Sequence, residues 1–205
     1  MLRIDHVAYA VRDLDVAAQR FYDEFGFSAV EKAVHPEWGT GNRIIPLGSH
    51  FIELVGIVDP KAAAHHFVGQ WLSAFTASGD RLAALCLNVD HIEEVTSRLG
   101  LQATPGFRAY SGGQKVTWHS AGMEAFAAEG LPYFFAWDDQ KYRLGPTRPQ
   151  HRIEPRGIAW VEMGGNPERI HEWIGGADLP LRVIDGKPGL HTVGIETVNG
   201  EVVLR

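Results

Sequence analysis

A short apolar run, a helix-capping residue, an amphipathic helix and a terminal glycine follow one another three times in this chain of 205 residues. The three capping residues are Asp13, Asp90 and Asn166. The second cap follows the first by 77 residues, and the third follows the second by 76. Recurrence at a nearly constant spacing is typical of one supersecondary unit used repeatedly. The sequence therefore predicts a fold built from repeated units.

Each unit is expected to contain one strand, one helix and then three more strands, which gives an α+β fold. The repeated βαβββ modules would form curved mixed sheets around a cleft, with a connecting helix between modules one and two. Turn residues and polar, proline-containing stretches mark the boundaries between the units. The predicted boundaries are module one at 1–58, a connecting helix at 59–81, module two at 82–138, a linker at 139–156 and a third βαβββ-like unit at 157–205.

Composition excludes several classes of protein. Hydrophobic residues make up 45% of the chain, and no apolar run approaches the roughly 18 residues of a membrane helix. The net charge is −6 and no stripe of Lys and Arg is present, which argues against nucleic acid as a partner. Cys86 is the one cysteine, so no intrachain disulfide can form, and its apolar strand predicts a small buried side chain. Without a signal-peptide pattern, a cytoplasmic location is expected.

Five segments carry a resemblance to a known group of proteins. They are Ile4–Val7, Arg12–Asp15, His35–Asn42, Phe51–Leu54 and Leu131–Asp138. Over roughly residues 1–140 the chain resembles the vicinal oxygen chelate superfamily, the glyoxalase, bleomycin-resistance and extradiol-dioxygenase fold, and within it the glyoxalase-like branch. The resemblance implies two βαβββ modules that pair around a cleft. It leaves the reaction open, because this fold serves isomerases, dioxygenases, thiol transferases and non-catalytic binders.

His6 and Glu53 are the candidate metal ligands. The resemblance implies a metal held by a histidine on the first strand and a glutamate on the fourth. Glu53 alternates with two apolar neighbours, so it faces either solvent or a cleft, and a cleft that holds a cation or a hydrogen-bond donor is expected. The other interpretation of His6 is a core histidine bonded to backbone or to Asp5. The implied ion is divalent, Zn, Fe, Ni or Mn, and Glu53 would be a ligand or a catalytic base.

The second module departs from this metal-binding pattern. Seven residues before the cap, as His6 stands to Asp13, it carries Ala83, and the third unit carries Ala159. The aligned fourth strand offers Tyr133, Phe134 and Phe135. A catalytic metal site needs about three protein ligands. His119 is a candidate for the third, although a surface or hairpin position explains this histidine better.

A loop and an aromatic group are the candidate substrate-binding elements. His35, Trp38 and Asn42 lie in a glycine-containing loop that can close over a ligand, or in which Trp38 plugs the barrel mouth. The aromatic group could line a pocket or belong to the core. The expected substrate-binding residues are His35, Trp38, Asn42, Trp118, His119, Tyr133 and Phe135.

Two functional classes remain after these arguments. The first is a metal-assisted enzyme, of lyase, isomerase or dioxygenase type, that acts on a small oxygen-bearing substrate. The second is a small-ligand binding or resistance protein of the same fold, in which His6 and Glu53 form a polar anchor. A homodimer is also expected, because a third, unpaired unit at 157–205 would expose a sheet edge unless it packs within the chain.

Overall fold

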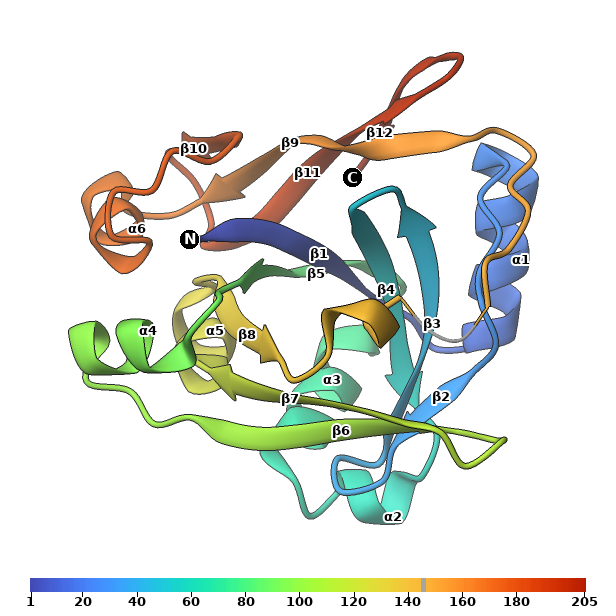
Figure 1. The fold of residues 1–205 in the computed structure, drawn as a ribbon, viewed down its shortest axis with the longest axis horizontal. Coiled ribbons are helices and arrows are strands. Elements are labelled where there is room, and N and C mark those ends of the chain that lie inside the picture. Colours follow the sequence, from blue (N-terminus) through green and yellow to red (C-terminus); the bar gives the residue numbers. More distant parts are fainter. Residues whose placement is uncertain (145–146) are drawn as a thin grey trace.

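Eight strands close into a barrel in the computed structural model, which describes residues 1–144 and 147–205 (Figure 1). The order around the barrel is β1-β4-β3-β2-β6-β7-β8-β5. This confirms the predicted α+β fold with curved mixed sheets around a cleft. The strands are β1 Arg3–Ala10, β2 Ala33–His35, β3 Thr40–Leu47, β4 His50–Ile57, β5 Arg81–Asn88, β6 Thr104–Tyr110, β7 Lys115–Ala121 and β8 Tyr133–Trp137.

The barrel is made of two equivalent four-strand halves. In each half the first strand runs parallel to the fourth, as β1 does to β4 and β5 does to β8. The halves join at two antiparallel seams, β1 with β5 and β2 with β6. Strands with both faces buried carry nearly continuous apolar sequence rather than strict alternation. One face of these strands fills the barrel, and the other packs under helices and a second sheet.

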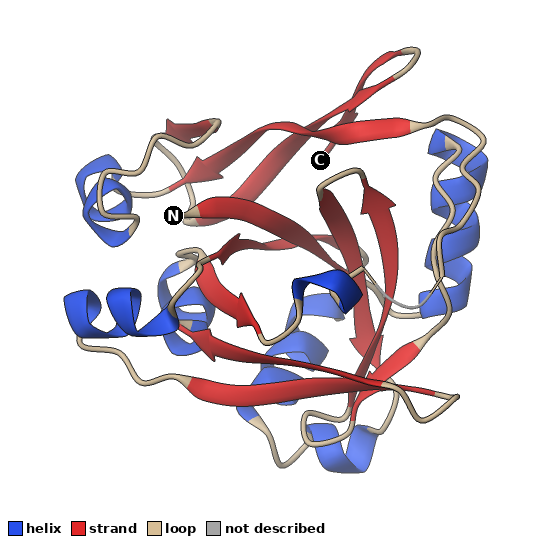
Figure 2. Cartoon of the chain, viewed as in Figure 1, coloured by secondary structure: helices blue, strands red, loops and turns tan. Residues whose placement is uncertain are grey.

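Helices lie on the outside of the strands (Figure 2). Helix α1, Leu14–Phe25, begins as expected, because the side chain of Asp13 accepts hydrogen bonds from two amides of its first turn. Helix α4, Ile92–Leu99, differs from the expectation, since its cap is His91. Asp90 instead pairs with Arg3 and the amino terminus. None of the helices in the described residues is both long and apolar enough to cross a membrane.

The connecting segment forms two helices, where the sequence predicts one. They are α2, Pro60–Ala63, and α3, Phe67–Thr76, and a further helix, α5, covers Met123–Glu129. Asp59 caps α2 and the ring nitrogen of His66 caps α3. Side chains of α3 and α5 reach the interior of the barrel, so these two helices help to enclose it.

The third unit forms a separate sheet beside the barrel, at the top of Figure 1. It contains a strand, a helix and three strands, but β9 lies between β10 and β11, whereas each barrel half places its first strand beside its fourth. Its elements are β9 Pro155–Gly164, α6 Pro167–Trp173, β10 Leu181–Ile184, β11 Gly189–Thr197 and β12 Gly200–Leu204. The local pattern therefore repeats, while the strand pairing does not.

This third unit packs against the rest of the same chain. The indole N–H of Trp173 donates to the carbonyl oxygen of Pro132 at 2.7 Å, and its ring lies 5.8 Å from that of Phe134. The segment before it, predicted as a linker at 139–156, includes residues 145–146, which lie outside the described residues. Its described part begins with the short helix η1, Gln140–Tyr142, and later runs along α1, where Arg152 donates to the carbonyl oxygen of Asp23 at 2.8 Å.

Candidate active site

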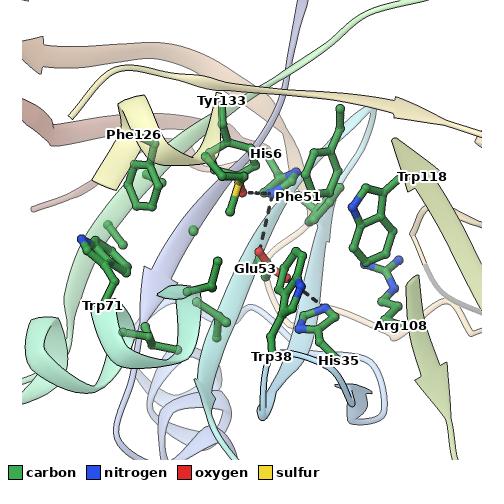
Figure 3. Close-up of a pocket in the computed structure, with 18 of the residues that line it drawn as sticks. His6, His35, Trp38, Phe51, Glu53, Trp71, Arg108, Trp118, Phe126 and Tyr133 are labelled. Atoms are coloured by element: carbon green, nitrogen blue, oxygen red, sulfur yellow. Dashed lines mark hydrogen bonds and ion pairs between the residues drawn. The ribbon is translucent and has the colours of Figure 1, made fainter. Parts of the chain in front are cut away.

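A cavity inside the barrel holds the polar residues that the sequence singled out (Figure 3). Its walls are mostly aromatic and aliphatic, and its free volume is about 50 Å³. In Figure 3, Glu53 and His6 occupy the middle, Trp71 and Phe126 lie on one side, and Arg108 lies on the other. Glu53 is the sole carboxylate among the described residues that line this cavity.

A bulge in β1 explains how two consecutive side chains, Asp5 and His6, come into contact. The pairing of β1 with β5 skips Asp5, because Ile4 pairs with Leu87 and the next pair is His6 with Cys86. An extra residue in one strand breaks the alternation of faces. Asp5 Oδ2 then lies 2.7 Å from His6 Nδ1, although neighbouring residues of a regular strand point to opposite faces.

Asp5 is held in place by two further residues. Arg143 donates from Nη1 to Oδ1 at 3.0 Å, and the indole N–H of Trp137 donates to Oδ2 at 3.2 Å. The carboxylate is only 2% exposed, so without these partners its burial would be costly. The arrangement fixes the His6 ring and directs its Nε2 into the cavity.

His6 Nε2 meets two oxygen atoms there. The hydroxyl of Tyr133 lies 2.8 Å away, and Glu53 Oε2 lies 3.6 Å away. Burial by itself lowers the pKa of His6, but interactions with Cys86, Asp5 and Glu53 outweigh it and raise that pKa well above 6.5. The surroundings of His6 Nε2, next to Glu53, therefore stabilise a positive charge.

Glu53 is ionised and firmly held. Burial opposes its charge, but His6, His35 and a hydrogen bond from Asn42 lower its pKa to about 2. Asn42 Nδ2 donates to Glu53 Oε1 at 2.6 Å. The prediction that Glu53 faces a cleft rather than solvent thus agrees with the geometry, because β4 places Glu53 and Phe51 on the inner face.

The residues predicted to form a loop lie beside this pair, but His35 ends β2 and Asn42 lies in β3, so only the turn at 36–39 is a loop. His35 Nε2 is 3.9 Å from Glu53 Oε1, and its Nδ1 is 2.9 Å from the hydroxyl of Thr40. Burial lowers the pKa of His35 to about 4, so this ring is neutral at pH 7. Trp38 covers His35, with ring centroids 5.2 Å apart, and both residues line the cavity.

The remaining predicted substrate-binding residues divide into two groups. Trp118, Tyr133 and Phe135 line the cavity. His119 does not, because β7 alternates and turns it outward, where it is 47% exposed and 3.3 Å from Asp138. It cannot reach His6 and Glu53 from that side of the strand.

The second half of the barrel has different residues at the equivalent positions. The starts of β5 and α4 repeat the spacing of the starts of β1 and α1, so Ala84 corresponds to His6 and Cys86 to Ala8. Glu53 pairs with Ala8 as Tyr133 pairs with Cys86, so Tyr133 corresponds to Glu53. Counting back from Asp90 gave Ala83, one residue short of Ala84, because the cap of α4 is His91. Donor atoms of Asp5, His6 and Cys86 lie within 4.8 Å of one another, close enough for one metal ion. Burial raises the pKa of the Cys86 thiol to about 12.

Sequence reasoning missed two arginines. Arg143, from the predicted linker, carries no pattern that would reveal its contact with Asp5. Arg108 is different, because it alternates with Tyr110 along a predicted strand, and such a strand places both on one face. That alternation could have identified Arg108 as an inward-facing cation; it is 1% exposed and lines the cavity.

Comparisons with known proteins agree with this architecture. A model of the glyoxalase-like domain family matches residues 4–177. A hypothetical protein from Staphylococcus aureus has a similar structure, with a TM-score of 0.69 and 16% identity, over 93% of this chain and 88% of that one. At this identity the likeness shows the fold alone.

Methylmalonyl-CoA epimerases also match in structure. A variant of the Streptomyces coelicolor enzyme gives a TM-score of 0.48 at 18% identity, over 67% of this chain and 98% of that one. The Mycobacterium tuberculosis enzyme gives 0.45 at 19%, over 66% and 86%. No curated protein sequence matches the chain. Because the family model spans most of the residues, the chain belongs to the glyoxalase-like domain family of the vicinal oxygen chelate superfamily.

Proposed function

We propose that this protein is a metal-assisted enzyme that acts on a small oxygen-bearing substrate inside the barrel, in a reaction of lyase, isomerase or dioxygenase type. One observation carries the proposal: His6 Nε2, the Glu53 carboxylate and the Tyr133 hydroxyl converge on one point of the cavity wall. Imidazole and carboxylate together suit Zn, Fe, Ni or Mn.

The residues present fit a divalent ion at this point. A metal-binding histidine commonly gives its other ring nitrogen to a carboxylate, as His6 Nδ1 does to Asp5 at 2.7 Å. His6 and Glu53 would be the ligands, with the Tyr133 hydroxyl as the nearest third donor. When bound, the ion would attract two neighbouring substrate oxygens and stabilise negative charge that develops on them.

Glu53 acts as a ligand rather than as a base in this proposal. A general base works best when its pKa lies near the operating pH, whereas the pKa of Glu53 is about 2. A low pKa suits a ligand, since a carboxylate must be deprotonated to bind a metal. Asn42 keeps Oε1 engaged and thereby orients Oε2 towards His6.

Metal analysis of untagged protein, purified without chelator or nickel resin, tests the proposal. We expect close to one ion per chain, and a loss of affinity of tenfold or more in both His6→Ala and Glu53→Gln. His119→Ala is the matched control, because that histidine points away from the cavity, and it should bind as the natural protein does. Protein that contains no metal, and takes up none of Zn, Fe, Ni or Mn, would refute the proposal.

Catalysis needs a second measurement. Deuterium uptake from D2O into small oxo and hydroxy compounds, followed by proton NMR, detects isomerase and lyase chemistry, and oxygen consumption detects a dioxygenase. We expect one of these signals with the metal-loaded protein and none with Glu53→Gln.

A binding protein is the second candidate function. Its supporting observation is that Ala84 and Tyr133 occupy the positions equivalent to His6 and Glu53, so the second half supplies neither an imidazole nor a carboxylate. This candidate predicts ligand binding in the cavity with neither metal uptake nor turnover.

A further inference from the structure

Arg108 is a buried cation without a buried anion beside it. The side chain is 1% exposed, and no carboxylate of the described residues forms an ion pair with it. A guanidinium carries five N–H donors. Of its nitrogens, only Nη2 donates within the described chain, to the carbonyl oxygen of Arg143, and Nε is buried without a partner.

The other buried arginine near the cavity shows what is missing. Arg143 has the carboxylate of Asp5 at 3.0 Å, whereas Arg108 has the faces of Tyr110 and Trp137, with centroids 5.8 and 5.4 Å away. Aromatic faces compensate a cation only in part. A buried charge without a paired anion is destabilising. The fold thus keeps on the cavity wall a positive charge that no ion pair among the described residues neutralises.

Neighbouring groups on the same two strands add to the imbalance. The indole N–H of Trp118 on β7 is buried without a hydrogen-bond partner among the described residues, and the Tyr110 hydroxyl on β6 interacts only with the Arg108 side chain. This part of the barrel therefore has more donors than acceptors. Glu53 does not correct the balance, because its two oxygens face Asn42 and His6.

We propose that Arg108 is the anchor for a carboxylate group, so that the ligand of this cavity is a small carboxylic acid. A carboxylate accepts hydrogen bonds without donating any, and its two oxygens match the fork of a guanidinium. One guanidinium suits a monoanion. In Figure 3, Arg108 lies to one side of Glu53 and His6, so an acid held at Arg108 can extend its remaining oxygens towards them.

The cavity also limits the size of the acid. A cavity needs about 10–15 Å³ of free volume for each water molecule that it holds. The free volume of about 50 Å³ therefore equals roughly three to five waters. An acid of about two to four carbon atoms is expected on this basis. That the bound acid is also the substrate of a reaction rests on the proposed function, whereas carboxylate binding by Arg108 does not.

Binding of propionate and of its neutral analogue propionamide to metal-free, full-length protein tests the inference. Tryptophan fluorescence is a suitable signal, because Trp38, Trp118 and Trp137 line the cavity. We expect the natural protein to prefer propionate by at least about tenfold, the range of hydrogen bonds to charged groups. Arg108→Met should abolish this preference, and Arg108→Lys should retain part of it because it keeps the charge but not the fork.

Arg182→Met is the control, since Arg182 stacks on Trp160 in the second sheet, outside the cavity. It should bind propionate as the natural protein does. Equal affinity for the acid and the amide in the natural protein would overturn the inference, and that comparison holds even if Arg108→Met does not fold. Retention of the preference in Arg108→Met would also overturn it. Because the binding experiment uses metal-free protein, its result can be interpreted even if the proposed metal-assisted function proves wrong.

Discussion

At the scale of single residues, the two buried arginines predict opposite effects on stability. Arg108→Met replaces an unpaired buried charge by an apolar side chain, so its free energy of unfolding should equal or exceed that of the natural protein in carboxylate-free buffer. Arg143→Met removes the arginine that pairs with the buried Asp5 and leaves only His6 beside that carboxylate, so it should lower the free energy of unfolding by about 3 kcal/mol. Urea unfolding measures both. Equal losses in the two variants would show that Arg108 is a structural residue.

His35 predicts a pH dependence. Its pKa is about 4 in the folded chain, chiefly because of burial, against 6.5 in an unfolded chain. Between pH 6.5 and 4 the unfolded chain binds a proton that the folded chain does not, so stability falls as the pH falls. Below pH 4 both forms are protonated, and the contribution stays constant. The slope due to this one residue approaches about 1.4 kcal/mol per pH unit.

His35→Gln should reduce this slope by about one proton in urea titrations between pH 6.5 and 4. His119→Gln is the control, because the exposed ring of His119 lies outside the barrel, and its profile should follow that of the natural protein. An unchanged slope in His35→Gln would mean that His35 is protonated in the folded state.

At the scale of elements, the turn after Trp38 positions one wall of the cavity. Gly39 has a φ of 67°, and a Cβ at this position would lie 2.2 Å from the backbone nitrogen of Ala63 in α2. Both the backbone conformation and the close approach require glycine here. We expect Gly39→Ala to lower the free energy of unfolding by about 2 kcal/mol or more and to shift the fluorescence of Trp38.

Gly112→Ala is the matched control, because a Cβ there meets nothing within 4 Å and its φ is not in the left-handed region. This change should be neutral to within about 0.5 kcal/mol. Comparable losses in both variants would contradict the role given to the contact of Gly39, in the turn between β2 and β3, with α2.

The elements also show how far sequence reasoning reaches. Periodicity and caps identify α1 and the strands that carry His6 and Glu53, since those signals are local. The inward direction of Glu53 also follows from alternation. The contact between Asp5 and His6 could not be predicted, because the bulge in β1 depends on pairing with β5. Likewise, the count that gave Ala83 in place of Ala84 took Asp90 as the helix cap, and only the structure shows that His91 caps α4 while Asp90 pairs with Arg3.

At the scale of the whole molecule, the third unit covers the outer face of the barrel within one chain. Its β11 lies against β5, and Trp173, Val193 and Ile195 belong to the same apolar core as Val7 and Leu85. The uncovered sheet face that motivated the expectation of a dimer is thus buried internally. The homodimer and the cytoplasmic location stay predictions.

Removal of residues 154–205 should therefore expose that apolar core and cause aggregation. Trp173→Ala tests the same interface more gently and should lower the free energy of unfolding by about 3–5 kcal/mol. Light scattering of the truncated chain at micromolar concentration and urea unfolding of the variant provide the measurements. A soluble, stable truncated chain would show instead that the barrel folds alone and that the third unit serves assembly.

The location of a bound metal ion tests the central claim most directly. Anomalous X-ray diffraction from crystals of the full chain loaded with Zn²⁺, recorded above and below the zinc edge, reveals such an ion without reference to any activity. The account predicts one strong peak inside the barrel, within coordination distance of His6 Nε2 and the Glu53 carboxylate. A barrel without a peak, or a peak only at surface residues, would contradict it.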